Sequence, residues 1–193
     1  MRKLILFLLI VLACTLPPPV DAQGLGPMGP GPGVKGYAAG PACSSGTADV
    51  TQSDGSSTGS VTTDARGQGF VPATNGSYLY SIKIYIGASP ARNVTMRWGT
   101  STDLTSGYYG EAVVNVGAAG WYEFVFADTT HQLSTSTTYY YGFVSAGTTT
   151  TYYYNNTNAY AGGAWRSASG GGVWNMGTTA AYDMLFEIDK CAD

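Results

Sequence analysis

The chain has 193 residues, only 11% of them charged, and a formal net charge of −3 at pH 7. Apart from the adjacent Arg2 and Lys3, its few lysines and arginines stand singly and do not neutralise a row of phosphates, so nucleic acid is excluded as an expected partner. Aromatic residues make up 13% of the sequence. This content excludes a disordered chain, which requires few aromatic residues and a high net charge.

Residues 1–22 have the layout of a signal peptide. Arg2 and Lys3 precede an uninterrupted apolar run at 4–13. This run is too short to cross a bilayer core of about 30 Å, so we expect no transmembrane segment. An alternative is a lipoprotein, because a lipobox-like motif ends at Cys14. Either alternative predicts a protein that is secreted or held at the cell surface.

Residues 23–47 read as a linker rich in glycine and proline, followed by one β-sandwich domain at 48–193. After signal cleavage only Cys43 and Cys191 remain, and an isolated pair in an exported protein is most often a disulfide. The bond would bring the two ends of the domain together. Two free thiols are the alternative, and no Cys-x-x-Cys motif supports a metal site.

The domain shows the two-residue period of strands that bury one face. Tyr122, Phe124 and Phe126 alternate with the outward set Trp121, Glu123 and Val125. The same alternation predicts strands in four further segments, with inward residues Tyr78, Tyr80, Ile82, Ile84 and Ile86; Val94, Met96 and Trp98; Tyr139, Tyr141 and Phe143; and Tyr182, Met184, Phe186 and Ile188.

Weaker strands are expected at 58–63, 68–73, 111–116 and 150–154. Glycine and threonine interrupt every candidate helix. Eight or more short strands separated by Gly, Ser and Asn turns predict an all-β fold, a two-layer antiparallel β-sandwich of jelly-roll type.

Several short motifs occur in a familiar order, at 69–73, 89–95, 120–124, 133–140, 160–163, Trp174 and 183–186. Over roughly residues 66–189 the chain resembles jelly-roll domains of bacterial and phage-associated surface proteins, such as the choice-of-anchor domains. Its layout is similar to that of carbohydrate-binding modules. The resemblance implies a jelly-roll fold and an extracellular setting, and it implies no particular ligand. The chain departs from such proteins in having no sorting motif and no attached catalytic domain.

Aromatic and amide side chains concentrate between residues 152 and 174. Sugars bind to aromatic faces, while Asn and Arg meet their hydroxyl groups, so this segment is a candidate glycan site on the rim of the sandwich. The candidate ligand-binding residues are Tyr152, Tyr154, Asn156, Tyr160, Trp165, Arg166 and Trp174. The alternative is that Trp174 and alternate tyrosines fill the core, because large aromatic residues mostly bury.

Carboxylates near the C-terminus have two functional interpretations. Asp183, Glu187 and Asp189 supply the oxygen ligands that calcium prefers, so a structural calcium is the one cofactor considered. Glu187 with either aspartate also forms a carboxylate pair of the kind that glycosidases use. A solvated strand face explains the same residues, and His131 has no recognisable catalytic partner, so we expect no enzyme.

The sequence thus predicts a secreted or surface-exposed, non-enzymatic binding module with carbohydrate as the first expected ligand. The alternative is a structural subunit of an extracellular fibre or coat, because few charges protect the strand edges from pairing with another copy. A glycosidase-like enzyme is the third alternative.

Overall fold

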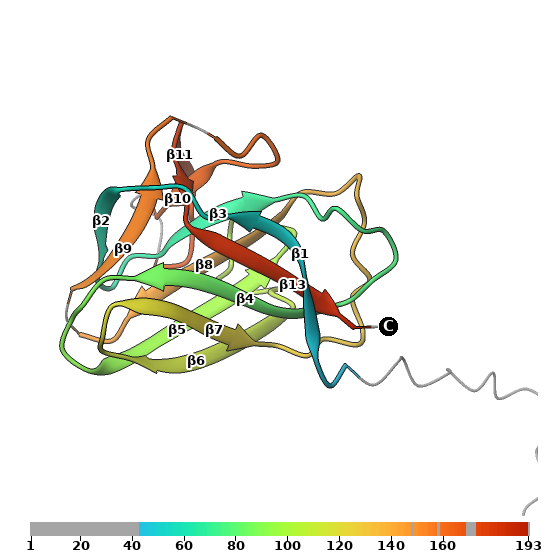
Figure 1. Ribbon diagram of the computed structural model, residues 1–193, viewed down its shortest axis with the longest axis horizontal. Coiled ribbons are helices and arrows are strands. Elements are labelled where there is room, and N and C mark those ends of the chain that lie inside the picture. The colour runs from blue at the N-terminus through green and yellow to red at the C-terminus, as the bar shows by residue number, and fades with distance from the viewer. Residues whose placement is uncertain (1–42, 148, 158, 169–172, 193) are drawn as a thin grey trace, which may run out of the picture. The chain divides into compact units, whose positions relative to one another are not determined.

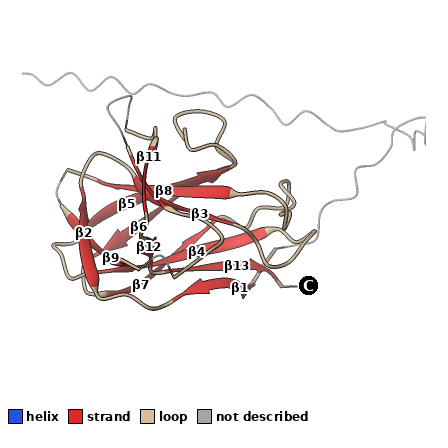
Figure 2. Cartoon of the chain, turned by 90° about the horizontal axis from the view of Figure 1, so that it is seen from above, coloured by secondary structure: helices blue, strands red, loops and turns tan. Residues whose placement is uncertain are grey.

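A computed structural model describes residues 43–147, 149–157, 159–168 and 173–192. Thirteen strands and no helix occur among these residues, and the strands form two antiparallel sheets packed as a β-sandwich (Figures 1 and 2). The predicted all-β sandwich is therefore confirmed. This described part contains no helix long and apolar enough to cross a membrane. The predicted signal peptide (1–22), Cys14 and linker residues 23–42 lie outside it.

The first sheet has seven strands in the order β1-β13-β4-β9-β12, with β2 paired to β9 and β7 paired to β4. Their bounds are β1 (Gly46–Gln52), β2 (Ser57–Val61), β4 (Leu79–Ile86), β7 (Gly120–Val125), β9 (Thr150–Asn155), β12 (Asp183–Met184) and β13 (Phe186–Cys191).

The second sheet has six strands in the order β11-β10-β3-β8-β5-β6. Their bounds are β3 (Arg66–Phe70), β5 (Arg92–Gly99), β6 (Gly110–Val116), β8 (Tyr139–Ser145), β10 (Trp165–Ser167) and β11 (Thr178–Ala180). This strand order does not establish the predicted jelly-roll connection, which stays a prediction.

The two ends of the domain meet, as the cysteines predict. Strand β1 pairs antiparallel with β13, with Gly46 opposite Cys191. Cys43 and Cys191 form a disulfide, with a Cα–Cα distance of 5.2 Å across a sequence separation of 148 residues. The domain therefore begins slightly before the predicted boundary at residue 48, because Cys43 and strand β1 already belong to it.

The core between the sheets consists of the inward residues of the alternating segments. Val94, Met96 and Trp98 of β5 are fully buried, and so are Ile82, Ile84 and Ile86 of β4. Burial of one face of each sheet provides the main stabilising free energy of such a fold. The prediction was wrong in two segments: it placed Tyr78 and Tyr80 inward in one, and Tyr182 inward and Asp183 outward in the other, whereas the structure buries Leu79 and Asp183.

A register irregularity explains the first of these differences. The pairing of β13 with β4 shifts between Asp189 and Lys190, so Leu79 takes the inward position that the alternation assigned to its neighbours. A single extra residue in a strand moves the following side chains to the opposite face. At the other end Met184, Phe186 and Ile188 are buried as predicted, but Asp183 is buried as well, where it accepts hydrogen bonds from Gln68 and Tyr160.

A second, smaller apolar cluster covers the outer face of the second sheet. Leu104, Met176 and Ala65 are fully buried there. The loops that carry Leu104 and Met176 are joined by backbone hydrogen bonds from Leu104 to Trp174 (3.0 Å) and from Met176 to Thr102 (2.9 Å). Loops therefore cover this face of the sheet. The strand pattern of the sequence did not predict this cluster.

Candidate functional site

Three of the predicted rim residues come together, but they pack into the sandwich. Tyr152 is only 3% exposed and belongs to the core, with Tyr154 and Trp165 packed against it. The indole Nε1 of Trp165 donates a 3.2 Å hydrogen bond to Oη of Tyr152. Burial raises the pKa of the Tyr152 hydroxyl. The face of Tyr152 is thus not available for stacking on a sugar.

Tyr160 also serves the fold. Its hydroxyl accepts a 2.9 Å hydrogen bond from the backbone N–H of Val71 and donates a 3.1 Å bond to the carbonyl of the same residue. Its ring lies edge-on to Phe186, with the centroids 5.2 Å apart. These contacts fasten the loop after β9 to the segment after β3.

Arg166 and Trp174 lie away from the other rim residues, on the outer side of the second sheet. The guanidinium of Arg166 lies 5.2 Å from the ring centroid of Tyr140, and that of Arg97 lies 4.4 Å from the ring of Trp174. The reason is the pleat of β10: consecutive residues of a strand point to opposite faces, so Arg166 faces away from the core that Trp165 contacts. The structure therefore places the predicted site residues Trp165 and Arg166 on opposite faces of the second sheet.

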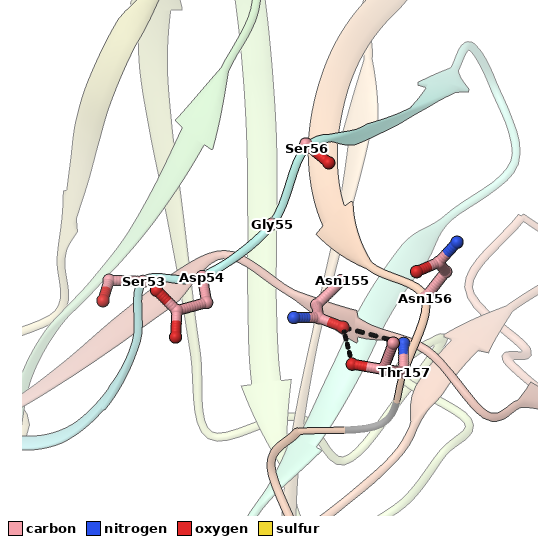
Figure 3. A pocket seen from close by; sticks show the side chains of 7 residues that line it. All are labelled: Ser53, Asp54, Gly55, Ser56, Asn155, Asn156 and Thr157. Carbon is pink, nitrogen blue, oxygen red and sulfur yellow. Dashed lines mark hydrogen bonds between the residues drawn. The ribbon is translucent and has the colours of Figure 1, made fainter.

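Asn156 borders a polar groove of about 410 Å³ at one end of the sandwich (Figure 3). Only polar residues and one glycine line it: Ser53, Asp54, Gly55, Ser56, Asn155, Asn156 and Thr157. The side-chain oxygen of Asn155 accepts hydrogen bonds from the backbone N–H and the hydroxyl of Thr157, drawn as dashed lines in Figure 3. The groove has hydroxyl-binding groups but no aromatic residue in its lining.

The three carboxylates considered for calcium all have protein partners in the structure. Asp183 is fully buried and accepts hydrogen bonds from Nε2 of Gln68 (2.9 Å) and the backbone N–H of Tyr160 (2.7 Å). Burial raises its pKa, and these two hydrogen bonds oppose that effect. Within the described residues no group of three His, Cys, Asp or Glu side chains is placed to hold a metal. A structural calcium stays a prediction of the sequence.

Glu187 and Asp189 instead share the ammonium group of Lys83. Nζ of Lys83 lies 2.6 Å from Oε1 of Glu187 and 2.8 Å from Oδ2 of Asp189. The hydrogen bond to Asp189 has the largest effect on the pKa of Lys83, and together with the hydrogen bond to Glu187 it raises this pKa well above its usual value. On the other side of Lys83, Glu123 accepts a 2.7 Å hydrogen bond from the hydroxyl of Ser81.

The outer face of the first sheet carries an aromatic row that sequence analysis did not identify. It consists of Tyr153 in β9, Tyr85 in β4 and Trp121 in β7. The ring of Tyr85 lies 5.1 Å from that of Tyr153 and 5.6 Å from that of Trp121, edge-on in both cases. Trp121 is 44% exposed. Val125 of the same strand is 46% exposed but lies beyond Glu123, outside the row.

A charged row runs beside the aromatic row, across the same sheet. Glu187, Lys83 and Glu123 lie opposite one another on β13, β4 and β7. Tyr85 and Trp121 are likewise opposite one another, two residues further along the same strands. The face therefore presents ring surfaces next to fixed hydrogen-bond donors and acceptors, all on strands that the sheet holds in place.

A signal for the aromatic row is present in the sequence. The alternation at 121–126 places Trp121 on the outward face with Glu123. A tryptophan at a solvent-facing strand position is unusual, because large aromatic residues mostly bury. Its neighbours Tyr85 and Tyr153 come from distant parts of the chain, so only the strand order brings them together.

Comparison with known proteins adds no functional assignment to this geometry: no family model matches the chain, and neither does any curated protein or solved structure. The resemblance to choice-of-anchor domains therefore stays a prediction.

Proposed function

We propose that this protein is an extracellular, non-enzymatic binding module for carbohydrate, and that the aromatic row on the first sheet is its binding surface. The observation that carries the proposal is the alignment of Tyr153, Tyr85 and the 44%-exposed Trp121 across three neighbouring strands. Neighbouring strands lie about 4.8 Å apart, so the row spans on the order of 10 Å. This length suits a short stretch of a polysaccharide rather than a single ion.

The chemistry of the two rows matches that of a sugar chain. Aromatic faces cover the apolar C–H surfaces of pyranose rings, whereas Glu123, Lys83 and Glu187 meet hydroxyl groups. The rings sit on a sheet rather than on loops, so little conformational entropy is lost on binding. An exposed apolar patch bordered by polar residues is also the usual character of a ligand surface.

The disulfide supports the extracellular setting, since such bonds persist in oxidising compartments. The enzyme alternative gains no comparable support. Asp183 is buried against Gln68, and Glu187 and Asp189 are both ion-paired with Lys83, which disfavours either predicted carboxylate pair as a general acid and base.

The test is retention in affinity electrophoresis gels that contain neutral polysaccharides, combined with a glycan array. We expect Trp121→Ala to lose at least tenfold in affinity, which corresponds to about 1.4 kcal/mol. Val125→Ala is the matched control, because it shortens an equally exposed side chain of the same strand outside the aromatic row. It should bind like the wild type.

A third variant separates the aromatic row from the predicted rim site. Trp165→Ala alters the rim cluster and leaves the first sheet's outer face intact. If Trp165→Ala abolishes retention while Trp121→Ala does not, the rim is the binding site and the aromatic row is not. If the folded wild-type protein binds no glycan in either assay, the carbohydrate proposal itself fails.

The second candidate is the structural subunit of a fibre or coat. The observation in its favour is that the second sheet ends in strands, β6 and β11, that have no further partner strand among the described residues. Polymers visible by negative-stain electron microscopy at native concentration would favour this candidate over the binding module.

A further inference from the structure

We propose that two copies of this chain form a symmetric dimer in which their β6 strands pair antiparallel, about a twofold axis that passes beside Val113. Strand β6 is the last strand of the second sheet and lies at one margin of the sandwich (Figure 1). It pairs with β5 alone among the described strands, in an unbroken register from Val116 opposite Arg92 to Gly110 opposite Trp98. No described strand pairs with its other side, because β7, which follows it in the chain, belongs to the first sheet.

Apart from one charged residue, Glu111, strand β6 has none of the sequence features that commonly protect sheet edges from pairing. Its sequence, Gly-Glu-Ala-Val-Val-Asn-Val, has no proline and no lysine, and its register with β5 has no bulge. Natural edge strands usually carry at least one of these devices. The middle residue, Val113, is 55% exposed, the highest value among the exposed large hydrophobic residues of the described chain.

The strand is complementary to itself in this register. With Val113 opposite its own copy, Glu111 faces Asn115 of the second chain, and Ala112 faces Val114. No like charges are opposed, and the most exposed apolar residue is covered by its equivalent. Glu111 is already neutralised within its own chain by Arg97, whose Nε lies 2.6 Å from its carboxylate. Cross-strand pairs of this kind stabilise a sheet, whereas opposed like charges destabilise it.

Such pairing closes after two copies, because each chain uses the same edge toward the other. It therefore produces a dimer rather than a fibre. A twofold axis perpendicular to the joined sheet leaves the outer faces of both first sheets pointing the same way. This consequence rests on the proposed function: both aromatic rows would face the same glycan surface, and binding through two sites raises the overall affinity without any new kind of contact.

Analytical ultracentrifugation of the secreted protein tests the dimer. We expect the wild type to sediment with twice the chain mass, and Val113→Lys to sediment with half the wild-type mass, because two lysines would then oppose each other. Asn115→Lys is the matched control: it adds the same charge to the same exposed edge, but opposite Glu111 of the second chain. It should remain dimeric. A wild type that stays monomeric up to its solubility limit overturns the proposal, and so does a Val113→Lys variant that stays dimeric.

A cross-link tests the register directly. Directly opposite residues of antiparallel strands have Cβ atoms about 4.5–5.5 Å apart, close enough for a disulfide after a small adjustment. Val113→Cys should therefore form a covalent dimer on mild oxidation, seen on a non-reducing gel. Val125→Cys, an exposed valine of β7, is the control and should remain monomeric on the gel. Equal cross-linking of both variants would mean random collision and would contradict the register. Because neither assay contains a glycan, the proposed dimer can be disproved while the proposed function stands, and the proposed function can be disproved while the dimer stands.

Discussion

Gln68 of β3 and Asp183 of β12 join the two sheets through the core. Nε2 of Gln68 donates a 2.9 Å hydrogen bond to the fully buried carboxylate of Asp183, while its Oε1 accepts a 3.2 Å bond from the backbone N–H of Met184. A buried carboxylate is costly unless its oxygens are hydrogen-bonded. This pair therefore holds β12 against the second sheet.

Replacing Gln68 with methionine should destabilise the protein by roughly 2 kcal/mol at neutral pH, because Asp183 loses one of its two donors. Urea unfolding measures the change. Burial raises the folded-state pKa of Asp183, and loss of the amide donor raises it further, so the deficit should shrink at acidic pH, where the carboxyl is protonated. Gln52→Met is the control, since the Gln52 amide bonds only to a backbone carbonyl. Equal stability of the Gln68 variant and the wild type would refute the role of the pair.

Gly67 should tolerate no side chain. A Cβ atom at this position of β3 would lie 1.9 Å from the backbone oxygen of Tyr141, and a backbone atom in a sheet cannot move aside. We expect Gly67→Ala to cost about 3 kcal/mol or more, measured by thermal or urea unfolding. Gly120→Ala is the matched substitution in β7, where a Cβ would meet nothing within 4 Å. It should be neutral or slightly stabilising.

The turn at Asp128 should make stability depend on pH. Burial alone would raise the pKa of Asp128, but hydrogen bonds from Thr130 and His131 outweigh it and lower the pKa below its usual value. A carboxyl whose pKa is lower in the folded state stabilises the fold above the unfolded-state pKa, near 3.8, and this contribution is lost as the pH falls through the folded value.

Asp128→Asn should therefore be less stable than the wild type by about 1 kcal/mol at neutral pH, and this difference should vanish in acid. Unfolding curves measured across the acidic range check it. Asp64→Asn removes the same charge from an exposed position and serves as the control. A difference that is constant over the whole range would show that shape rather than charge is responsible.

Loss of the Cys43–Cys191 disulfide should destabilise the domain strongly. The bond closes a loop of 148 residues, for which the chain-entropy model gives a contribution on the order of 5 kcal/mol. Cys43→Ser should lower the urea midpoint by an amount similar to that seen on reduction of the wild type. If reduction leaves the midpoint unchanged, the disulfide does not stabilise the domain in this way.

Local alternation was enough to predict the core strands. Val94, Met96 and Trp98 are buried as their spacing indicates, because successive side chains of a strand point to opposite faces wherever one face is covered. The short strands β10 and β11 were not predicted, since three residues are too few to show a period. Leu79 escaped prediction because the register irregularity near it arises from pairing with β13, and Asp183 did because its buried partners Gln68 and Tyr160 come from other parts of the chain.

Proximity in the sequence did not predict which residues of the candidate site lie together in space. Trp165 and Arg166 are adjacent in the sequence and face opposite sides of a sheet, so the predicted rim site divides between them. Tyr85, Trp121 and Tyr153 are far apart in the sequence and form one row, because β4 pairs with β7 along one side and meets β9 at its end.

By itself, the sequence determined that the domain is all-β, that its ends are joined by a disulfide, and which face of most strands is buried, because these properties depend on covalent spacing and on which residues avoid water. Only the tertiary structure decided which outward side chains become neighbours. That choice depends on strand order and register, which are set by the packing of the whole chain and not by any one segment.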